Sequence, residues 1–321
     1  MSGFAGILSV DGGTPDVKLL HQMVERLAFR GPDATQVWTR PGAGFCFTFL
    51  RTGPAPQATT QPCTVDARVW LLGDVRLDGR DDLQRELEHA GESIEEAATD
   101  EELVLRAWRQ WGEQGLARLL GDFSFALWDE TAKQLWCLRD LTGARPFFYV
   151  SSTDWLCFSN SLDVVRLFPG VSSALDRQFI GDFLINESSL DAWRTVYQDV
   201  RRLAPGHFLK HSRGELSVRR FAAFPIEEPL WLKRPTDYVD RFQCLLERAV
   251  VDRLPHDPSA IFLSGGLDST SIAAVATRIA KRRGTPGLSL AFTADSRPLF
   301  DDQESTLASR VAAELGLAPT S

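Results

Sequence analysis

The sequence has 321 residues, and at roughly 150 residues per domain this length predicts two domains. Its formal charge of −8, from 35 basic and 43 acidic side chains, argues against nucleic acid as a partner, because phosphate binding needs a basic patch. No apolar run approaches the roughly 18 residues of a membrane span, the first residues lack the basic region of a signal peptide, and the five cysteines are scattered. We therefore expect a cytoplasmic protein with reduced thiols and no membrane partner.

The first half of the sequence has mostly strand patterns with a few helices. A helix is predicted over residues 15–28, with Thr14 as its N-cap and Pro15 at the first helical position. A second helix is predicted from the capping-box pattern of Thr99 and Glu102. Short β-rich runs separated by turn signals predict an antiparallel sheet packed on helices. These strand candidates are 44–50, 69–75, 123–128, 134–139, 146–150 and 155–159.

The pattern changes in the second half, after a connecting region at about residues 160–225 that contains a turn and strand at 201–209. A proline-rich segment at 225–235 is typical of a linker. The elements that follow alternate between helix and strand, which predicts the opening of a doubly wound parallel sheet. They are a helix at about 238–249, a strand at 259–263, a helix at 269–282, a strand at 288–293 and a helix at 303–315.

A glycine-rich turn joins the strand at 259–263 to the next helix, with the sequence Ser-Gly-Gly-Leu-Asp-Ser at residues 264–269. Glycines let the backbone come close to a ligand, and backbone N–H groups with the helix N-terminus face an anion. The turn lacks the lysine of the Walker loop. Asp268 suits an anion site as a group that contacts a shared Mg²⁺ or as a hydrogen-bond acceptor that orients the loop. These features favour a phosphate site; the alternative is a tight strand-to-helix turn with a capping side chain.

This hexapeptide resembles the SGGxDS loop of the ATP pyrophosphatases, which cleave ATP between its α- and β-phosphates. The resemblance implies ATP and Mg²⁺ as cofactors, with the backbone near Leu263 and Phe292 beside the adenine. It implies a Mg²⁺ contact for Asp268 and a place near the nucleotide for Glu304, whose alternative role is a favourable charge at a helix N-terminus. The implied pyrophosphate-binding residues are Ser264, Gly265, Gly266, Asp268 and Ser269.

Motifs in the first 150 residues resemble, in the same order, the class II glutaminase domain of asparagine synthetases. They are MSGFAGI at 1–7, RGPD at 30–33, GD at 73–74, TD at 99–100, GDFSFALWD at 121–129 and RDLTGARP at 139–146. The charged residues of the last motif are predicted to form a structural network beneath the first domain.

With the SGGxDS loop behind these motifs, the whole chain resembles the asparagine synthetase architecture. This implies an α/β protein with an N-terminal αββα sandwich of the Ntn-hydrolase type (α+β), followed by the start of a doubly wound parallel α/β domain. The implied domains are a class II glutaminase-like domain at 1–210, a connecting segment at 211–235 and an incomplete ATP pyrophosphatase domain at 236–321.

The match to the glutaminase departs from the family at the reacting groups. The family has an N-terminal cysteine whose own amine serves as the base, and this chain has Ser2 there. The family's Asn-Gly oxyanion hole appears as Leu72 followed by Gly73, and leucine offers no donor. Arg51 and Asp100 match the positions that hold the carboxylate and amine of glutamine, although Asp100 is equally suited to a helix cap. We expect an inactive glutaminase with Ser2 in the nucleophile's position.

An inactive glutaminase leaves another amine as the nucleophile, as in the β-lactam synthetases and lasso peptide cyclases, which the chain also resembles. The leading hypothesis is an ATP-dependent amide ligase that adenylates an Asp or Glu side-chain carboxylate, releases pyrophosphate and forms an amide with an amine. A glutamine-hydrolysing asparagine synthetase and a truncated, non-catalytic nucleotide- or partner-binding protein are the alternatives. The expected partners are a small amino acid or peptide carboxylate, a precursor peptide with its processing protease, and a second copy in a homodimer.

The second predicted domain is short for its class. Residues 236–321 contain only two clear parallel strands, whereas a doubly wound domain has about five. The family also carries a second phosphate-side motif of the SGxGxDE type further along, and no such stretch occurs before Ser321. We therefore expect the natural enzyme to be considerably longer than this chain, or this chain to be catalytically incomplete alone.

Overall fold

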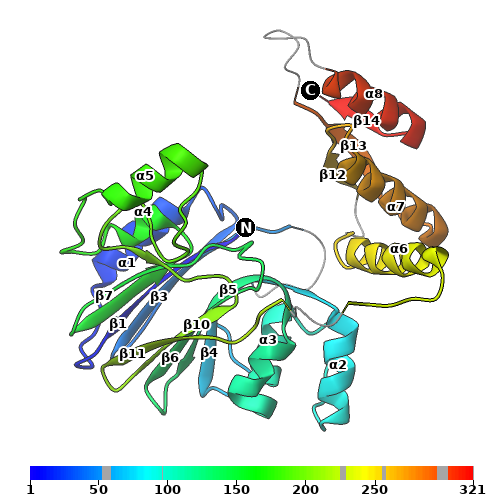
Figure 1. Ribbon diagram of the computed structural model, residues 1–321. Coiled ribbons are helices and arrows are strands. Elements are labelled where there is room, and N and C mark those ends of the chain that lie inside the picture. Colours follow the sequence, from blue (N-terminus) through cyan, green and yellow to red (C-terminus); the bar gives the residue numbers. More distant parts are fainter. Residues whose placement is uncertain (53–58, 96, 225–228, 255–257, 295–302, 321) are drawn as a thin grey trace. The chain divides into compact units, whose positions relative to one another are not determined.

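The computed structural model describes residues 1–321 except 53–58, 96, 225–228, 255–257, 295–302 and 321 (Figure 1). The described residues divide into two compact units, unit 1 within residues 1–52 and 59–224 and unit 2 within residues 229–320. Residues 215–220, which the sequence analysis assigned to a connecting segment, form a strand of unit 1. No helix among the described residues is long and apolar enough to cross a bilayer.

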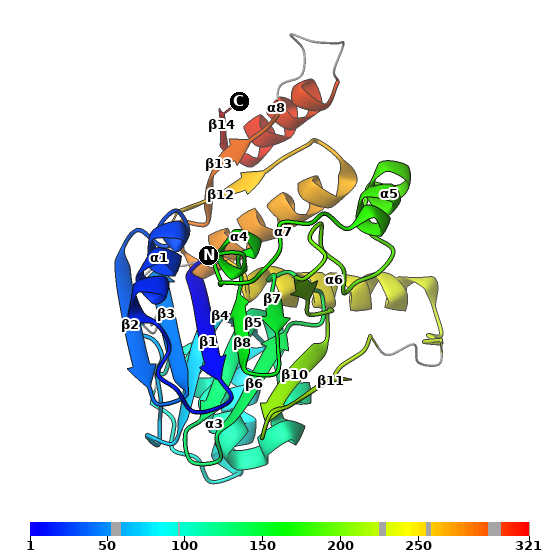
Figure 2. The ribbon, with the colours of Figure 1, turned by 90° about the vertical axis from the view of Figure 1, so that its left-hand side faces the viewer.

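Unit 1 contains two antiparallel sheets, as the strand patterns predicted. The larger sheet has the order β2-β3-β1-β8-β7-β9 and the smaller has the order β11-β10-β6-β5-β4 (Figure 2). The larger sheet consists of β1 Gly3–Ser9, β2 Ala34–Arg40, β3 Ala43–Phe49, β7 Phe148–Ser151, β8 Trp155–Ser159 and β9 Arg201–Arg202. The smaller sheet consists of β4 Val69–Asp78, β5 Leu120–Asp129, β6 Gln134–Arg139, β10 His207–Ser212 and β11 Glu215–Arg220.

The helices of unit 1 are α1 Val17–Leu27, α2 Arg80–His89, α3 Asp100–Trp111, the 3-10 helix η1 Gly112–Arg118, α4 Leu162–Val165 and α5 Arg177–Asn186. Most of them cover the outer faces of the two sheets: α1 and α4 pack on the larger sheet, and α2, α3 and η1 pack on the smaller one. Successive side chains of a strand point to opposite faces, so Leu71 of β4 packs under α2 and α3 while Leu72 packs between the sheets. Phe4 and Phe158 fill the same inter-sheet layer, and α1 and α4 cover the other face of the larger sheet. These layers confirm the predicted αββα sandwich.

The sequence signals placed one helix start correctly and another incorrectly. The capping box before α3 is confirmed, because the Thr99 hydroxyl accepts from the Glu102 N–H at 3.2 Å and the Glu102 carboxylate accepts from the Thr99 N–H at 2.8 Å. The prediction that Thr14 caps the first helix is wrong. Asp16 is the N-cap of α1, since its carboxylate accepts from the Lys18 N–H at 2.8 Å.

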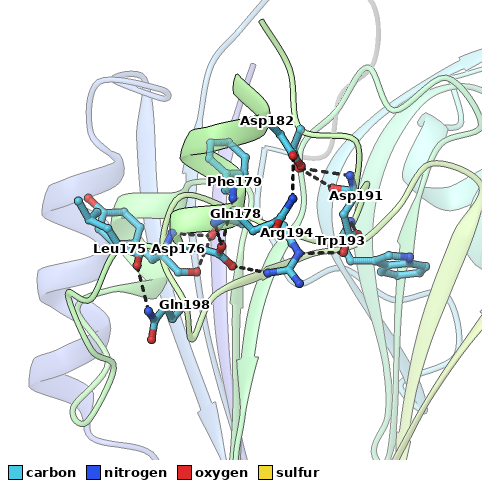
Figure 3. Close-up of polar contacts among 12 residues, drawn as sticks. Leu175, Asp176, Gln178, Phe179, Asp182, Asp191, Trp193, Arg194 and Gln198 are labelled. Atoms are coloured by element: carbon cyan, nitrogen blue, oxygen red, sulfur yellow. Dashed lines mark hydrogen bonds and ion pairs between the residues drawn. The ribbon is translucent and has the colours of Figure 1, made fainter. Parts of the chain in front are cut away.

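The region expected to be connecting, residues 160–225, contains α4, α5 and three strands of the two sheets. Side-chain carboxylates fix α5 (Figure 3). Asp176 caps its first turn and pairs with Arg194 at 2.7 Å, and the buried Asp182 accepts from the Gln178 side chain at 2.9 Å. The ion pair joins residues 18 positions apart, so no local periodicity signals this helix.

Unit 2 is a parallel α/β unit. It contains α6 Pro235–Val251, β12 Ser259–Phe262, α7 Leu267–Arg283, β13 Leu288–Phe292, α8 Glu304–Leu315 and β14 Ala318–Thr320. The order β12-β13-β14, with both pairs parallel, confirms the predicted start of a doubly wound sheet. The expectation of two strands is corrected by β14, whose three residues are too few to show a pattern. Ala273 of α7, Ala291 of β13 and Ala308 of α8 share one small core.

His211 of β10 is expected to make the stability of unit 1 depend on pH. Its side chain is buried, and burial lowers the pKa of His211 from its usual value of 6.5. Below about pH 6.5 the unfolded chain therefore binds a proton that the folded chain resists, and the free energy of unfolding falls as pH drops through the folded pKa. Urea denaturation between pH 7.5 and about 5 should show a shallower fall for His211→Gln than for wild type. Equal slopes would contradict this prediction.

Candidate active sites

The glycine-rich turn at 264–269 joins β12 to α7 and is held by serine hydroxyls. The hydroxyl oxygens of Ser264 and Ser269 lie 3.0 Å apart, and the Ser264 N–H donates to the Ser269 hydroxyl at 3.3 Å. The N–H of Gly266, the N-cap residue of α7, donates to the Ser264 hydroxyl at 3.3 Å. An anion at this loop would meet two hydroxyls and the uncapped N-terminus of a 17-residue helix, which is a favourable place for phosphate.

Gly265 is the loop position that requires glycine. Its φ is +77°, and a Cβ there would lie 2.7 Å from both the Leu307 Cβ and the Ala308 nitrogen. The loop therefore lies directly on α8, the helix that begins at Glu304. This packing fixes the turn before any ligand arrives.

The structure brings Leu263 and Phe292 together at the ends of adjacent strands. The N–H of Leu263 donates to the carbonyl of Phe292 at 2.8 Å, and the carbonyl of Leu263 accepts from the Thr293 hydroxyl at 2.8 Å. Leu263 is buried, whereas Phe292 is 37% exposed and its ring centroid lies 6.0 Å from that of Phe262. The strand ends thus carry an exposed apolar surface, and the predicted adenine contact near Leu263 and Phe292 stays a prediction.

Asp268 and Glu304 lie in the first turns of α7 and α8, and both residues are exposed. In the part of unit 2 that the structure describes, they do not join a third acidic, histidine or cysteine residue in a group able to hold a metal. Mg²⁺ usually takes one or two protein carboxylates and completes its shell with phosphate and water oxygens. These donors fit a Mg²⁺ ion that arrives with a nucleotide. The Mg²⁺ contact of Asp268 and the place of Glu304 near the nucleotide stay predictions.

Ser2 is buried in unit 1. Its hydroxyl oxygen accepts a hydrogen bond from the Leu50 N–H at 3.2 Å. Arg51, the next residue after Leu50, is exposed. Asp74 accepts from the Ser2 backbone N–H and lies 3.2 Å from the Arg145 Nε. Burial raises the pKa of Asp74, and Arg145 opposes that shift. The Leu50 N–H donates to the Ser2 hydroxyl. It therefore does not act as the base that a hydroxyl nucleophile needs to take its proton.

Gly73 and Asp100, the predicted glutamine contacts, each have partners within unit 1. The Gly73 N–H donates to the side-chain oxygen of Gln61 at 2.6 Å. Asp100 accepts from the Leu77 N–H at 2.9 Å and pairs with Arg80 through its other oxygen. The sequence reasoning missed Gln61 and Arg80 because neither belongs to one of the recognised motifs, and only the fold brings them to these groups.

Residues 139–146 form a network, but its contacts are mainly hydrogen bonds to backbone groups rather than the predicted pairing of charges. Arg139 donates to the carbonyls of Gly143 at 2.6 Å, Arg145 at 2.8 Å and Leu203 at 2.8 Å. Asp140 is fully buried and accepts from the Arg145 N–H at 2.9 Å. Arg145 also pairs with Asp74, which accepts from the Ser2 N–H, so this network contacts the surroundings of Ser2.

Each of the two units matches a known protein family. The family described as "Glutamine amidotransferase domain" matches residues 1–222, and the family described as "Asparagine synthase" matches residues 241–321. Asparagine synthetase (glutamine-hydrolyzing) 3 of Bacillus subtilis is 27% identical over 272 residues, covering 83% of this chain and 43% of that protein. A putative asparagine synthetase (glutamine-hydrolyzing) of Mycobacterium bovis is 28% identical over 298 residues, covering 86% of this chain and 44% of that protein.

The chain therefore spans less than half the length of these two relatives. A solved structure described as the allosteric regulatory enzyme of purine biosynthesis aligns at 16% identity with a TM-score of 0.50, covering 90% of this chain and 64% of that one. At this identity the likeness concerns the fold alone. With a glutamine amidotransferase domain at residues 1–222 followed by an asparagine synthase domain at 241–321, the chain belongs to the asparagine synthetase family.

Proposed function

We propose that this protein is an ATP-dependent amide ligase that activates a carboxylate by adenylation and does not hydrolyse glutamine. The observation that carries the ligase proposal is the loop at 264–269, where two serine hydroxyls and a free helix N-terminus meet on a backbone turn. Such a loop binds the phosphates of a nucleotide without a lysine. The asparagine synthase match at residues 241–321 supports this assignment.

The proposed reaction has two balanced steps. A carboxylate oxygen of the acid attacks the α-phosphorus of ATP, the bond to the β-phosphate oxygen breaks, and pyrophosphate leaves. An amine nitrogen then attacks the activated carbonyl carbon, the bond to the AMP oxygen breaks, and the amine's proton passes to solvent. Ser264, Ser269 and the first N–H groups of α7 would hold the departing pyrophosphate, and Asp268 would contact its Mg²⁺.

Unit 1 supports the second half of the proposal, because its reacting positions lack the required groups. Ser2 offers a hydroxyl that accepts a backbone hydrogen bond, and a hydroxyl forms an anion far less readily than a thiol. Leu72 is 1% exposed and packs between the two sheets, so it places a hydrocarbon where an oxyanion donor is needed. Losing one such donor slows catalysis by about 10²–10³-fold.

The acid that the proposed ligase activates is an Asp or Glu side chain, in an amino acid or a peptide.

A glutamine-hydrolysing asparagine synthetase is the second candidate, which the names of the two relatives favour. Both candidates activate a carboxylate, which hydroxylamine converts to a hydroxamate, so the acid that supports hydroxamate formation and the release of ammonia from glutamine separate them. With ATP, Mg²⁺ and an acidic peptide, the protein should form hydroxamate, and Ser264→Ala/Ser269→Ala should lower the rate. Glutamine alone should yield no ammonia above background. Ammonia release that Ser2→Ala abolishes would show that unit 1 is a working glutaminase.

A further inference from the structure

The carboxylate of Asp100 is engaged on both oxygens by its own unit. Asp100 is the first residue of α3, and its side chain is 21% exposed. One oxygen accepts from the Leu77 N–H at 2.9 Å, and the other pairs with the Arg80 guanidinium. The same guanidinium donates to the Ala98 carbonyl. Arg80 therefore ties the start of α2 to the start of α3 and covers the acidic group between them.

A second internal contact lies beside the first. Gln61 is 1% exposed; its side-chain oxygen accepts from the Gly73 N–H at 2.6 Å and its side-chain nitrogen donates to the Glu101 carboxylate at 3.3 Å. Glu101, which follows Asp100 in the chain, is also buried. The Gln61 carboxamide thus accepts from the Gly73 N–H, and the Arg80 guanidinium pairs with the Asp100 carboxylate.

We infer that Arg80 is a specificity-determining residue that excludes free amino acids from unit 1 by occupying Asp100. This inference rests on the proposed function, and it extends that proposal from the loss of hydrolysis to the loss of binding. The α-ammonium of an amino acid would have to displace a guanidinium that has a second partner at Ala98. The incoming cation would also be repelled by Arg80 until that side chain moves away.

Isothermal titration of the 321-residue protein with L-glutamine tests this inference. Wild type should give no saturable binding at low millimolar concentration. Arg80→Ala should gain saturable binding in the millimolar range or below, where enzyme affinities for small substrates commonly lie. The gain should vanish in Arg80→Ala/Asp100→Asn, and Arg80→Ala should not bind 4-carbamoylbutanoate, which lacks the ammonium group. Arg80→Gln, which removes the charge and retains a donor for Ala98, serves as a second variant with less risk to the fold.

Arg85→Ala is the matched control, because Arg85 lies on the same helix. Among the described residues, its side chain forms an ion pair with Asp82 of that helix and with no residue of α3. It should bind no more glutamine than wild type. Glutamine binding by wild type, or folded Arg80→Ala and Arg80→Gln proteins that both fail to bind, would overturn the inference. Neither result touches the proposed function, which instead fails if wild type releases ammonia from glutamine.

Discussion

Replacing Arg139 with alanine is expected to lower the free energy of unfolding of unit 1 by about 3 kcal/mol or more. The guanidinium donates to three carbonyls, those of Gly143, Arg145 and Leu203. Burial lowers the pKa of Arg139 to about 10, so the side chain still carries its charge and all of its donors at neutral pH. Alanine would leave three carbonyls without this donor. The bond to Leu203 is buried and the bonds to Gly143 and Arg145 are half-buried, and a buried unsatisfied group costs about 1–3 kcal/mol. Urea denaturation at pH 7 measures the loss.

Arg68→Ala is the control for this prediction. Arg68 pairs with Asp129 at 3.0 Å, but its side chain is 60% exposed, and such pairs contribute about 1 kcal/mol or less. A similar loss of stability in the two variants would mean that the Arg139 hydrogen bonds do not stabilise residues 139–146. Arg139 also holds Arg145, which pairs with Asp74. Because Asp74 accepts from the Ser2 N–H, Arg139→Ala should disturb the surroundings of Ser2 as well.

Gly265→Ala is expected to abolish ATP binding by the loop at 264–269. The positive φ is unfavourable for alanine, and the added Cβ would meet the backbone of α8 at 2.7 Å. Either the loop or α8 has to move, and both carry groups of the proposed nucleotide site. Calorimetric titration with Mg·ATP should show binding for wild type and none for this variant.

Gly284→Ala is the matched control at the other end of the same helix. Gly284 is the C-cap of α7 and also has a positive φ, of +67°, but no atom lies within 4 Å of its added Cβ. This variant should lose about 1 kcal/mol of stability and keep its affinity for ATP. Wild-type ATP affinity in Gly265→Ala would contradict the proposed phosphate site.

Local signals predicted the elements that local chemistry determines. The capping box of Thr99 and Glu102 marks the start of α3, and the strand-turn-helix pattern around residues 264–269 marks β12 and α7. Strand β1 was not predicted, because all but the last of its seven residues are buried and its short apolar run shows no alternation. Helix α5 was not predicted, because the Asp176–Arg194 pair that fixes it joins distant residues.

The candidate sites divide in the same way. The motif at 264–269 identified a loop whose serines do lie together, with Leu263 and Phe292 at the adjoining strand ends. In unit 1 the positions of Ser2, Gly73 and Asp100 were identifiable by resemblance, but their partners were not. Gln61 lies 12 residues from Gly73 and Arg80 lies 20 from Asp100, and neither spacing has a local meaning.

ATP–pyrophosphate exchange shows whether the protein activates an acid by adenylation, because label returns from pyrophosphate to ATP only if a carboxylate is adenylated reversibly. The protein should catalyse exchange that depends on an acidic substrate, and an acidic peptide should stimulate it more than aspartate does. Glutamine should add nothing, and Gly265→Ala should exchange no label. Exchange stimulated by aspartate together with ammonia release from glutamine would contradict the account and identify a conventional asparagine synthetase.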